Sequence, residues 1–165
     1  GVQTCALPIY MSFEVIYLII KCTINNKEKE LSIRPDDFLA DTLRENGYVS
    51  VKKGCDTGSC GLCTVMVNDK AVLSCNYLTA RVEGQHITTL EGVLDEAKKF
   101  GDFLADEGAD QCGFCAPGFI MMVLAMKREL QNPTEEEVID YVNGNLCRCT
   151  GYKGQLRAIH KYLNT

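Results

Sequence analysis

Short runs of alternating apolar and polar residues fill the first half of the chain, a pattern typical of half-buried β-strands. In the first run the apolar side chains recur at every second position from Ile16 to Ile24. Between the strand-like runs, residues 35–47 carry an apolar stripe at helical spacing and end at Gly47, a typical helix stop. The predicted strands cover residues 13–24, 28–33, 64–67, 71–74 and 87–90. The pattern predicts strands around one helix, a ubiquitin-like α+β half.

The second half of the chain has the 3.6-residue period of helices. Pro117 stands in a predicted first turn, where its missing N–H costs nothing. Thr134 and Glu137 have the spacing of a capping box. The predicted helices cover residues 92–107, 117–131, 134–143 and 154–163. The predicted fold class is therefore α+β, with a strand-rich domain over residues 13–90 and a four-helix domain over residues 91–165.

The first residues fit neither half. Residues 1–10 match no element that follows, and Met11 looks like a natural start. We interpret residues 1–12 as a non-native or disordered leader and leave Cys5 out of the functional argument.

Composition excludes several functions. The chain has 165 residues and a net charge of −5, so it lacks the basic patch expected of a nucleic-acid-binding protein. The apolar run over residues 15–20 is far shorter than the ~20 residues of a membrane span. Residues 1–20 also lack a basic stretch and a cleavage site, so we expect a cytoplasmic protein. Ten cysteines then leave two interpretations, a secreted disulfide scaffold or intracellular metal ligation, and the spacing of the cysteines decides between them.

The first cysteine set is Cys55, Cys60 and Cys63, followed by Cys75. Its C-x4-C-x2-C spacing is that of plant-type [2Fe–2S] proteins, in which four thiolates hold the cluster. Glycines within this run allow the backbone to fold tightly around a cluster. A structural zinc site is the alternative, although zinc ligands favour C-x2–4-C pairs separated by a longer spacer.

The second set is Cys112 and Cys115, then Cys147 and Cys149. Both pairs directly precede predicted helices, whose N-termini favour anionic groups. The spacing favours an iron–sulfur cluster but leaves a four-cysteine zinc site open.

Three ordered motifs carry a family resemblance: the chain contains GCDTGSCGLCTV, then QCGFCAPGF, then NLCRCTGY. Together they resemble the small iron–sulfur subunit of the molybdenum hydroxylases, which include xanthine dehydrogenase, aldehyde oxidoreductase and carbon monoxide dehydrogenase. The resemblance implies a plant-type ferredoxin-like β-grasp domain followed by a four-helix-bundle domain. It further implies two [2Fe–2S] clusters, an outer one and an inner one. The implied ligands are Cys55, Cys60, Cys63 and Cys75 for the outer cluster, and Cys112, Cys115, Cys147 and Cys149 for the inner cluster.

The resemblance also implies partners. In such enzymes electrons leave a molybdopterin-bound molybdenum, pass the inner and then the outer cluster, and usually reach FAD. Gln111 matches the motif glutamine that hydrogen-bonds the pterin, and the backbone beside Cys149 also approaches it. We expect a molybdopterin-binding catalytic subunit and an FAD-binding subunit as partners, because 165 residues cannot house those cofactors as well. Lys153-Gly154 stands where the family often has a glutamine, so contacts there are expected to differ.

We expect an electron-transfer subunit without substrate chemistry of its own. The substrate of the complex would be xanthine or another purine, N-heterocycle or aldehyde. The alternatives are a free-standing ferredoxin-like carrier and a zinc-binding structural module.

Overall fold

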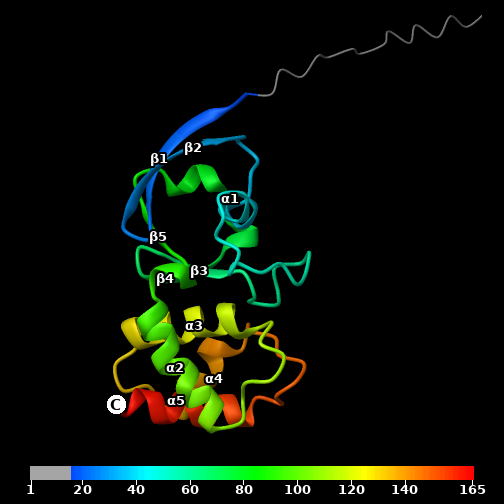
Figure 1. Cartoon of the computed structure of the whole chain (residues 1–165), viewed down its shortest axis with the longest axis vertical. Helices are drawn as coiled ribbons and strands as arrows, with labels where there is room; N and C mark the ends of the chain where they lie inside the picture. The colour runs from blue at the N-terminus through cyan, green and yellow to red at the C-terminus, as the bar shows by residue number, and fades with distance from the viewer. Residues whose placement is uncertain (1–15) are drawn as a thin grey trace, which may run out of the picture.

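The structure, a computed structural model, describes residues 16–165. These residues form an α+β fold in which a five-stranded mixed sheet and one helix are followed by four further helices (Figure 1). The predicted α+β class is thus confirmed. The expectations for residues 1–12, for Cys5 and for strand residues 13–15 lie outside the described part of the chain.

Two hairpins and one further strand make up the sheet, in the order β2-β1-β5-β3-β4. Asn25 and Asn26 form the first tight turn with φ angles of 51° and 62°, and Asn68 and Asp69 form the second with 49° and 64°. β1 and β5 pair in parallel, and the other pairs are antiparallel. The strands are β1 (Leu18–Ile24), β2 (Lys27–Ile33), β3 (Thr64–Val67), β4 (Lys70–Leu73) and β5 (His86–Thr88).

The first strand differs from its prediction. Residues 16 and 17 were predicted to belong to it, but the strand begins at Leu18, and Ile16 and Leu18 are 67% and 38% exposed instead of buried. The cause is the short contact with β5, which pairs with β1 only at Thr23 and Ile24. The start of β1 therefore extends beyond the core.

Helix α1 (Leu39–Glu45) packs on the sheet and, with Ile24, Ile33 and Val65 among others, forms the first hydrophobic core. The second core lies among the four later helices, where Phe100 contacts the rings of Phe119 and Tyr162. These helices are α2 (Leu94–Asp106), α3 (Ala116–Glu129), α4 (Glu135–Val142) and α5 (Lys153–Leu163). Their bounds agree with the predictions within two residues, and the Thr134–Glu137 capping box is present.

Strand β3 is shared by both cores. Val65 and Val67 belong to the core of the sheet half, whereas Met66 belongs to the core of the helices. Arg128 of α3 donates to Met66 Sδ at 2.8 Å and also pairs with Glu96 of α2. The sheet half therefore rests directly on α3, as the arrangement of the two halves in Figure 1 shows. No helix within residues 16–165 is long and apolar enough to cross a membrane.

Candidate metal centres

The first cysteine set lies where the loop after α1 meets the end of the second hairpin. Cys55, Cys60 and Cys63 lie on the loop, and Cys75 lies in the short 3₁₀ helix η1 (Ser74–Asn76) that follows β4. Ser74 holds the two segments together, because its N–H and its hydroxyl both donate to the Cys63 carbonyl, at 3.3 and 2.6 Å. The structure therefore brings Cys75 back to the predicted loop ligands.

Gly58 gives this loop a backbone conformation that favours glycine. Its φ is +67°, and a Cβ there would come within 2.0 Å of Asn76 Nδ2. A side chain at this position would therefore strain the backbone and displace the Asn76 side chain. This observation confirms the sequence-based interpretation that glycine allows a tight loop here.

The thiols of the first set interact as two pairs. A hydrogen bond from Cys60 and further bonds from the backbone of the loop lower the pKa of Cys55 to about 6. Burial raises the pKa of Cys75 to about 12, and its hydrogen bond with Cys63 adds to the shift. The two pairs are Cys55 with Cys60 and Cys63 with Cys75, and in each pair one thiol stays protonated beside the sulfur of the other. A metal ion would replace these protons, as thiolate ligation requires.

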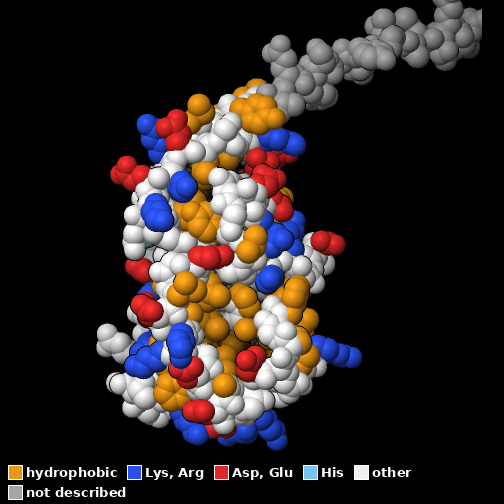
Figure 2. All heavy atoms as spheres, in the orientation of Figure 1, with side chains coloured by type: hydrophobic (Ala, Val, Ile, Leu, Met, Phe, Trp, Pro, Cys, Tyr) orange, Lys and Arg blue, Asp and Glu red, His pale blue; other side chains and the backbone are white. Residues whose placement is uncertain are grey.

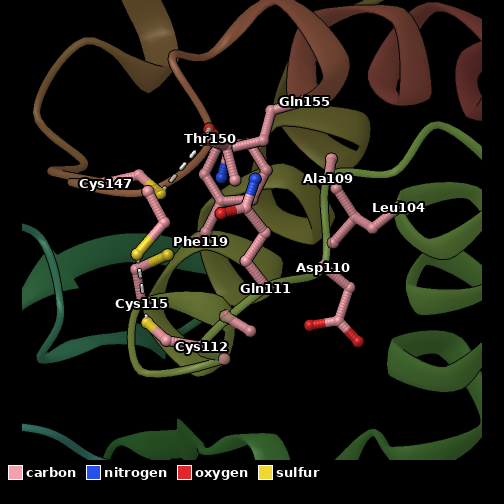
Figure 3. Close-up of a pocket in the computed structure, with 13 residues that line it drawn as sticks. Leu104, Ala109, Asp110, Gln111, Cys112, Cys115, Phe119, Cys147, Thr150 and Gln155 are labelled. Carbon is pink, nitrogen blue, oxygen red and sulfur yellow. Dashed lines mark hydrogen bonds between the residues drawn. The ribbon is translucent and has the colours of Figure 1, made fainter.

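The second set lies at the entrances of two helices. Cys112 and Cys115 stand at the end of the α2–α3 connection, with Cys115 at the N-cap of α3, and Cys147 and Cys149 stand between α4 and α5. Cys112 Sγ and Cys149 Sγ are 3.5 Å apart. Cys115 and Cys147 form the other hydrogen-bonded pair, on the same side of the pocket in Figure 3.

Burial, together with the hydrogen bond to Cys147, raises the pKa of Cys115 to about 12. Burial also opposes ionisation of Cys147, but hydrogen bonds from Thr150 and from the Cys149 N–H outweigh it and hold the pKa of Cys147 below its usual value. The Thr150 hydroxyl donates to Cys147 Sγ at 3.1 Å, and the Cys147 N–H donates to the Tyr152 hydroxyl at 2.9 Å. The α4–α5 loop thus favours a thiolate at Cys147.

The pairing fits a two-iron cluster better than zinc. A structural zinc ion needs four ligands around a single point. In a four-cysteine [2Fe–2S] cluster each iron takes two thiolates, and two neighbouring pairs are what each set provides.

A backbone contact joins the two sets. The Leu146 N–H donates to the Cys60 carbonyl at 2.9 Å, so the residue before Cys147 is hydrogen-bonded to a member of the first set. A shallow groove of about 170 Å³ lies between the second cysteine set and the loop of the first set, which contributes Gly54 and Leu62 to its lining. Space-filling shows hydrophobic side chains gathered over α3 on this side of the helical half (Figure 2).

Gln111 lies beside the second set. It is exposed overall, yet it lines the pocket formed by Cys112, Cys115, Cys147 and Cys149. In Figure 3 its side chain extends into that pocket, on the same side as Phe119 and Thr150. The structure therefore places Gln111 in the lining of the cysteine pocket, with its amide directed inward.

Three residues of these sites escaped the sequence analysis: Asn145, Thr150 and Tyr152. The motif NLCRCTGY contains all three, so their closeness to the ligands was visible. The contacts of Thr150 and Tyr152 were not visible, because they depend on left-handed backbone at Gly151 and Tyr152, with φ angles of 63° and 67°. Asn145 packs against Gly61, which is far away along the chain.

Comparison with protein families agrees with both sites. A model described as "2Fe-2S iron-sulfur cluster binding domain" matches residues 22–99, and one described as "[2Fe-2S] binding domain" matches residues 89–160. Each match contains one complete cysteine set. The fold and the paired thiols thus define an iron–sulfur protein of the [2Fe–2S] type.

Proteins of similar sequence and structure show which kind of [2Fe–2S] protein this is. The chain is 46% identical over 143 residues to the xanthine dehydrogenase iron-sulfur-binding subunit of Escherichia coli O157:H7, covering 82% of this chain and 88% of the relative. It is 39% identical over 138 residues to the nicotinate dehydrogenase small FeS subunit of Eubacterium barkeri, with the same coverage. Quinoline 2-oxidoreductase from Pseudomonas putida 86 has a chain of similar structure, with a TM-score of 0.81, 36% identity and coverage of 89% and 93%.

The chain belongs to the iron–sulfur subunits of the molybdenum hydroxylases and is an electron-transfer component of an oxidoreductase.

Proposed function

We propose that this chain carries two [2Fe–2S] clusters and relays electrons from a molybdopterin site, through the inner and then the outer cluster, towards FAD or another acceptor. Residues 13–90 form the ferredoxin-like β-grasp domain of the outer cluster, and residues 91–165 form the helical domain of the inner cluster. The outer ligands are Cys55, Cys60, Cys63 and Cys75, and the inner ligands are Cys112, Cys115, Cys147 and Cys149.

The observation that carries this proposal is the joining of two paired thiol sets by the hydrogen bond from the Leu146 N–H to the Cys60 carbonyl. Each cluster, when bound, supplies one-electron redox chemistry. The role of the chain is to hold both clusters at a fixed separation. A single backbone hydrogen bond connects the segments that carry the two ligand sets. This link favours the relay over a zinc module, which has no use for it.

The same proposal covers the partners. Because the relatives are named as subunits of xanthine and nicotinate dehydrogenases, a molybdopterin-binding catalytic subunit and an FAD-binding subunit are the partners we propose, in the cytoplasm. Gln111 and the backbone at Cys149 lie at the pterin side. The substrate class is a purine or another N-heterocycle, with xanthine as the first choice given the 46% identity to a xanthine dehydrogenase subunit.

Metal and sulfide analysis tests the cluster assignment. The purified chain should contain about four iron and four labile sulfide, since each four-cysteine set binds two of each. Reduced samples should show two distinct paramagnetic signals. Stoichiometric zinc without sulfide would contradict the proposal and support the structural module.

A second arm of the test addresses the free-standing carrier. The chain alone should reduce no dye with xanthine, nicotinate or an aldehyde, whereas the complex that copurifies with it should do so. A tagged chain that brings down no molybdenum-containing subunit would favour the free-standing carrier instead.

A further inference from the structure

One buried amide group has no partner in the protein. Asn145 lies between α4 and Cys147 and is only 5% exposed. Its Nδ2 is the only buried side-chain nitrogen or oxygen within residues 16–165 that makes no hydrogen bond. Buried donors in native proteins are nearly always paired, so this one needs a specific explanation.

The surroundings of Asn145 belong to the first cysteine set rather than to its own. A Cβ built on Gly61 would come within 2.8 Å of Asn145 Cγ and 2.5 Å of the Gly144 carbonyl oxygen. Gly61 directly follows Cys60, whose carbonyl accepts the Leu146 N–H. The Asn145 side chain is therefore pressed against the loop that carries Cys60 and Cys63, although its own segment leads to Cys147.

We propose that the Asn145 Nδ2–H group donates to a sulfur atom of the outer cluster, the one held by Cys55, Cys60, Cys63 and Cys75. This inference rests on the proposed function, because it requires that cluster. Asn145 is then a positioning residue: the helical half contributes a hydrogen-bond donor to the cluster of the sheet half. The unpaired donor is explained by an acceptor that the polypeptide alone does not supply.

Such a bond has a defined electrochemical effect. The reduced cluster carries one more negative charge than the oxidised cluster, so a donor to its sulfur stabilises the reduced form more. Removing the donor should lower the reduction potential of the outer cluster. A net hydrogen bond in a protein corresponds to a change of up to about tenfold in an equilibrium constant, or ~59 mV for one electron.

The variant Asn145→Leu removes the donor at similar volume. In the full chain with both clusters bound, a redox titration followed by electron paramagnetic resonance should show a lower potential for the outer cluster and an unchanged potential for the inner one. Asn143→Leu is the matched control, because Asn143 is exposed, lies two residues away and undergoes the same chemical change. It should leave both potentials at their wild-type values.

A second variant and a second measurement distinguish loss of the hydrogen bond from misfolding of the Asn145→Leu variant. Asn145→Ala introduces no bulk and should shift the outer cluster in the same direction. In D₂O, the reduced wild-type outer cluster should show a deuteron coupling in electron–nuclear double resonance that both Asn145 variants lack.

Unchanged outer potentials in both variants, with iron and sulfide content intact, would overturn the inference and assign the amide to a buried water. A shift confined to the inner cluster would also overturn it. In both cases the two clusters are present, so the proposed function stands. Absence of iron would instead overturn both.

Discussion

Tyr152 illustrates how one residue can hold a ligand loop in place. Its φ of 67° is left-handed, a conformation that costs a residue with a Cβ about 1–2 kcal/mol. The same turn places its hydroxyl 2.9 Å from the Cys147 N–H and allows Thr150 to reach Cys147 Sγ. The strain at Tyr152 is therefore offset by contacts that orient the ligand, which is typical of strained residues at functional sites.

Gln111 is the residue whose role is most directly testable. Under the proposed function the Gln111 amide hydrogen-bonds the pterin, so Gln111→Ala should slow reduction of the inner cluster by substrate in the reconstituted complex while leaving iron content unchanged. The affinity for the catalytic subunit should fall by about tenfold at most, given that a neutral hydrogen bond contributes about 0.5–1.5 kcal/mol. Rapid-mixing spectrophotometry measures the rate, and the exposed Gln131→Ala is the control.

An unchanged rate at full cluster occupancy would make Gln111 an ordinary loop residue. Loss of the inner cluster would instead mean that the inward-directed side chain in Figure 3 supports Cys112.

Among the elements, α3 packs directly against the backbone of the loop that carries the first cysteine set. Gly118 lies in its first turns, and a Cβ there would come within 2.4 Å of the Gly61 carbonyl oxygen and 2.8 Å of Leu62 Cα. The helix can approach the first cysteine loop only because this position lacks a side chain. Cys115, three residues earlier, is brought near the first cysteine set by the same contact.

This contact predicts an unusual effect of alanine in a helix. Gly118→Ala should destabilise the iron-loaded chain by about 1–3 kcal/mol, because the new methyl group meets backbone that cannot move aside. Gly101→Ala in α2, where a Cβ meets nothing within 4 Å, should stabilise it by about 0.5–1 kcal/mol. Urea unfolding of both variants measures the difference. Equal effects at the two positions would contradict the close contact at Gly118.

The elements themselves were largely predictable. The helices follow from local signals such as Thr134 and Pro117, which act within one turn of the chain. The exposed start of β1 was not predictable, because it depends on where the parallel strand β5 begins, more than 60 residues later. Strand β3 was predicted with its observed bounds, but its contribution to both cores was not. Periodicity shows that Met66 alternates with its neighbours but not that helices cover its face.

For the molecule as a whole, the two thiol sets should fail independently. Cys60→Ser should remove the paramagnetic signal of the outer cluster and leave the inner one, because each set has its own loops and its own hydrophobic core. Cys115→Ser should have the reverse effect. Loss of both signals in either variant would show that the halves assemble their clusters only jointly.

The spacing and the family resemblance of three motifs marked all eight cysteines as candidate ligands. They did not show which thiols pair. The pairing of Cys112 with Cys149 brings together segments 37 residues apart, and the link from Leu146 to Cys60 joins the two halves. Such contacts are set by tertiary packing, and no local pattern encodes them.

Because β3 contributes side chains to both hydrophobic cores, the two halves of this protein cannot be freely exchanged with those of its relatives. A chimera joined near residue 90 would pair Met66 and Gly61 of one parent with the Gly118 and Arg128 positions of another. Across the junction, Arg128 meets Met66, and Gly118 lies against the backbone of Gly61. An exchange that looks modular along the chain is therefore constrained in space, and functional hybrids should be recovered only when both parents carry compatible residues at these positions.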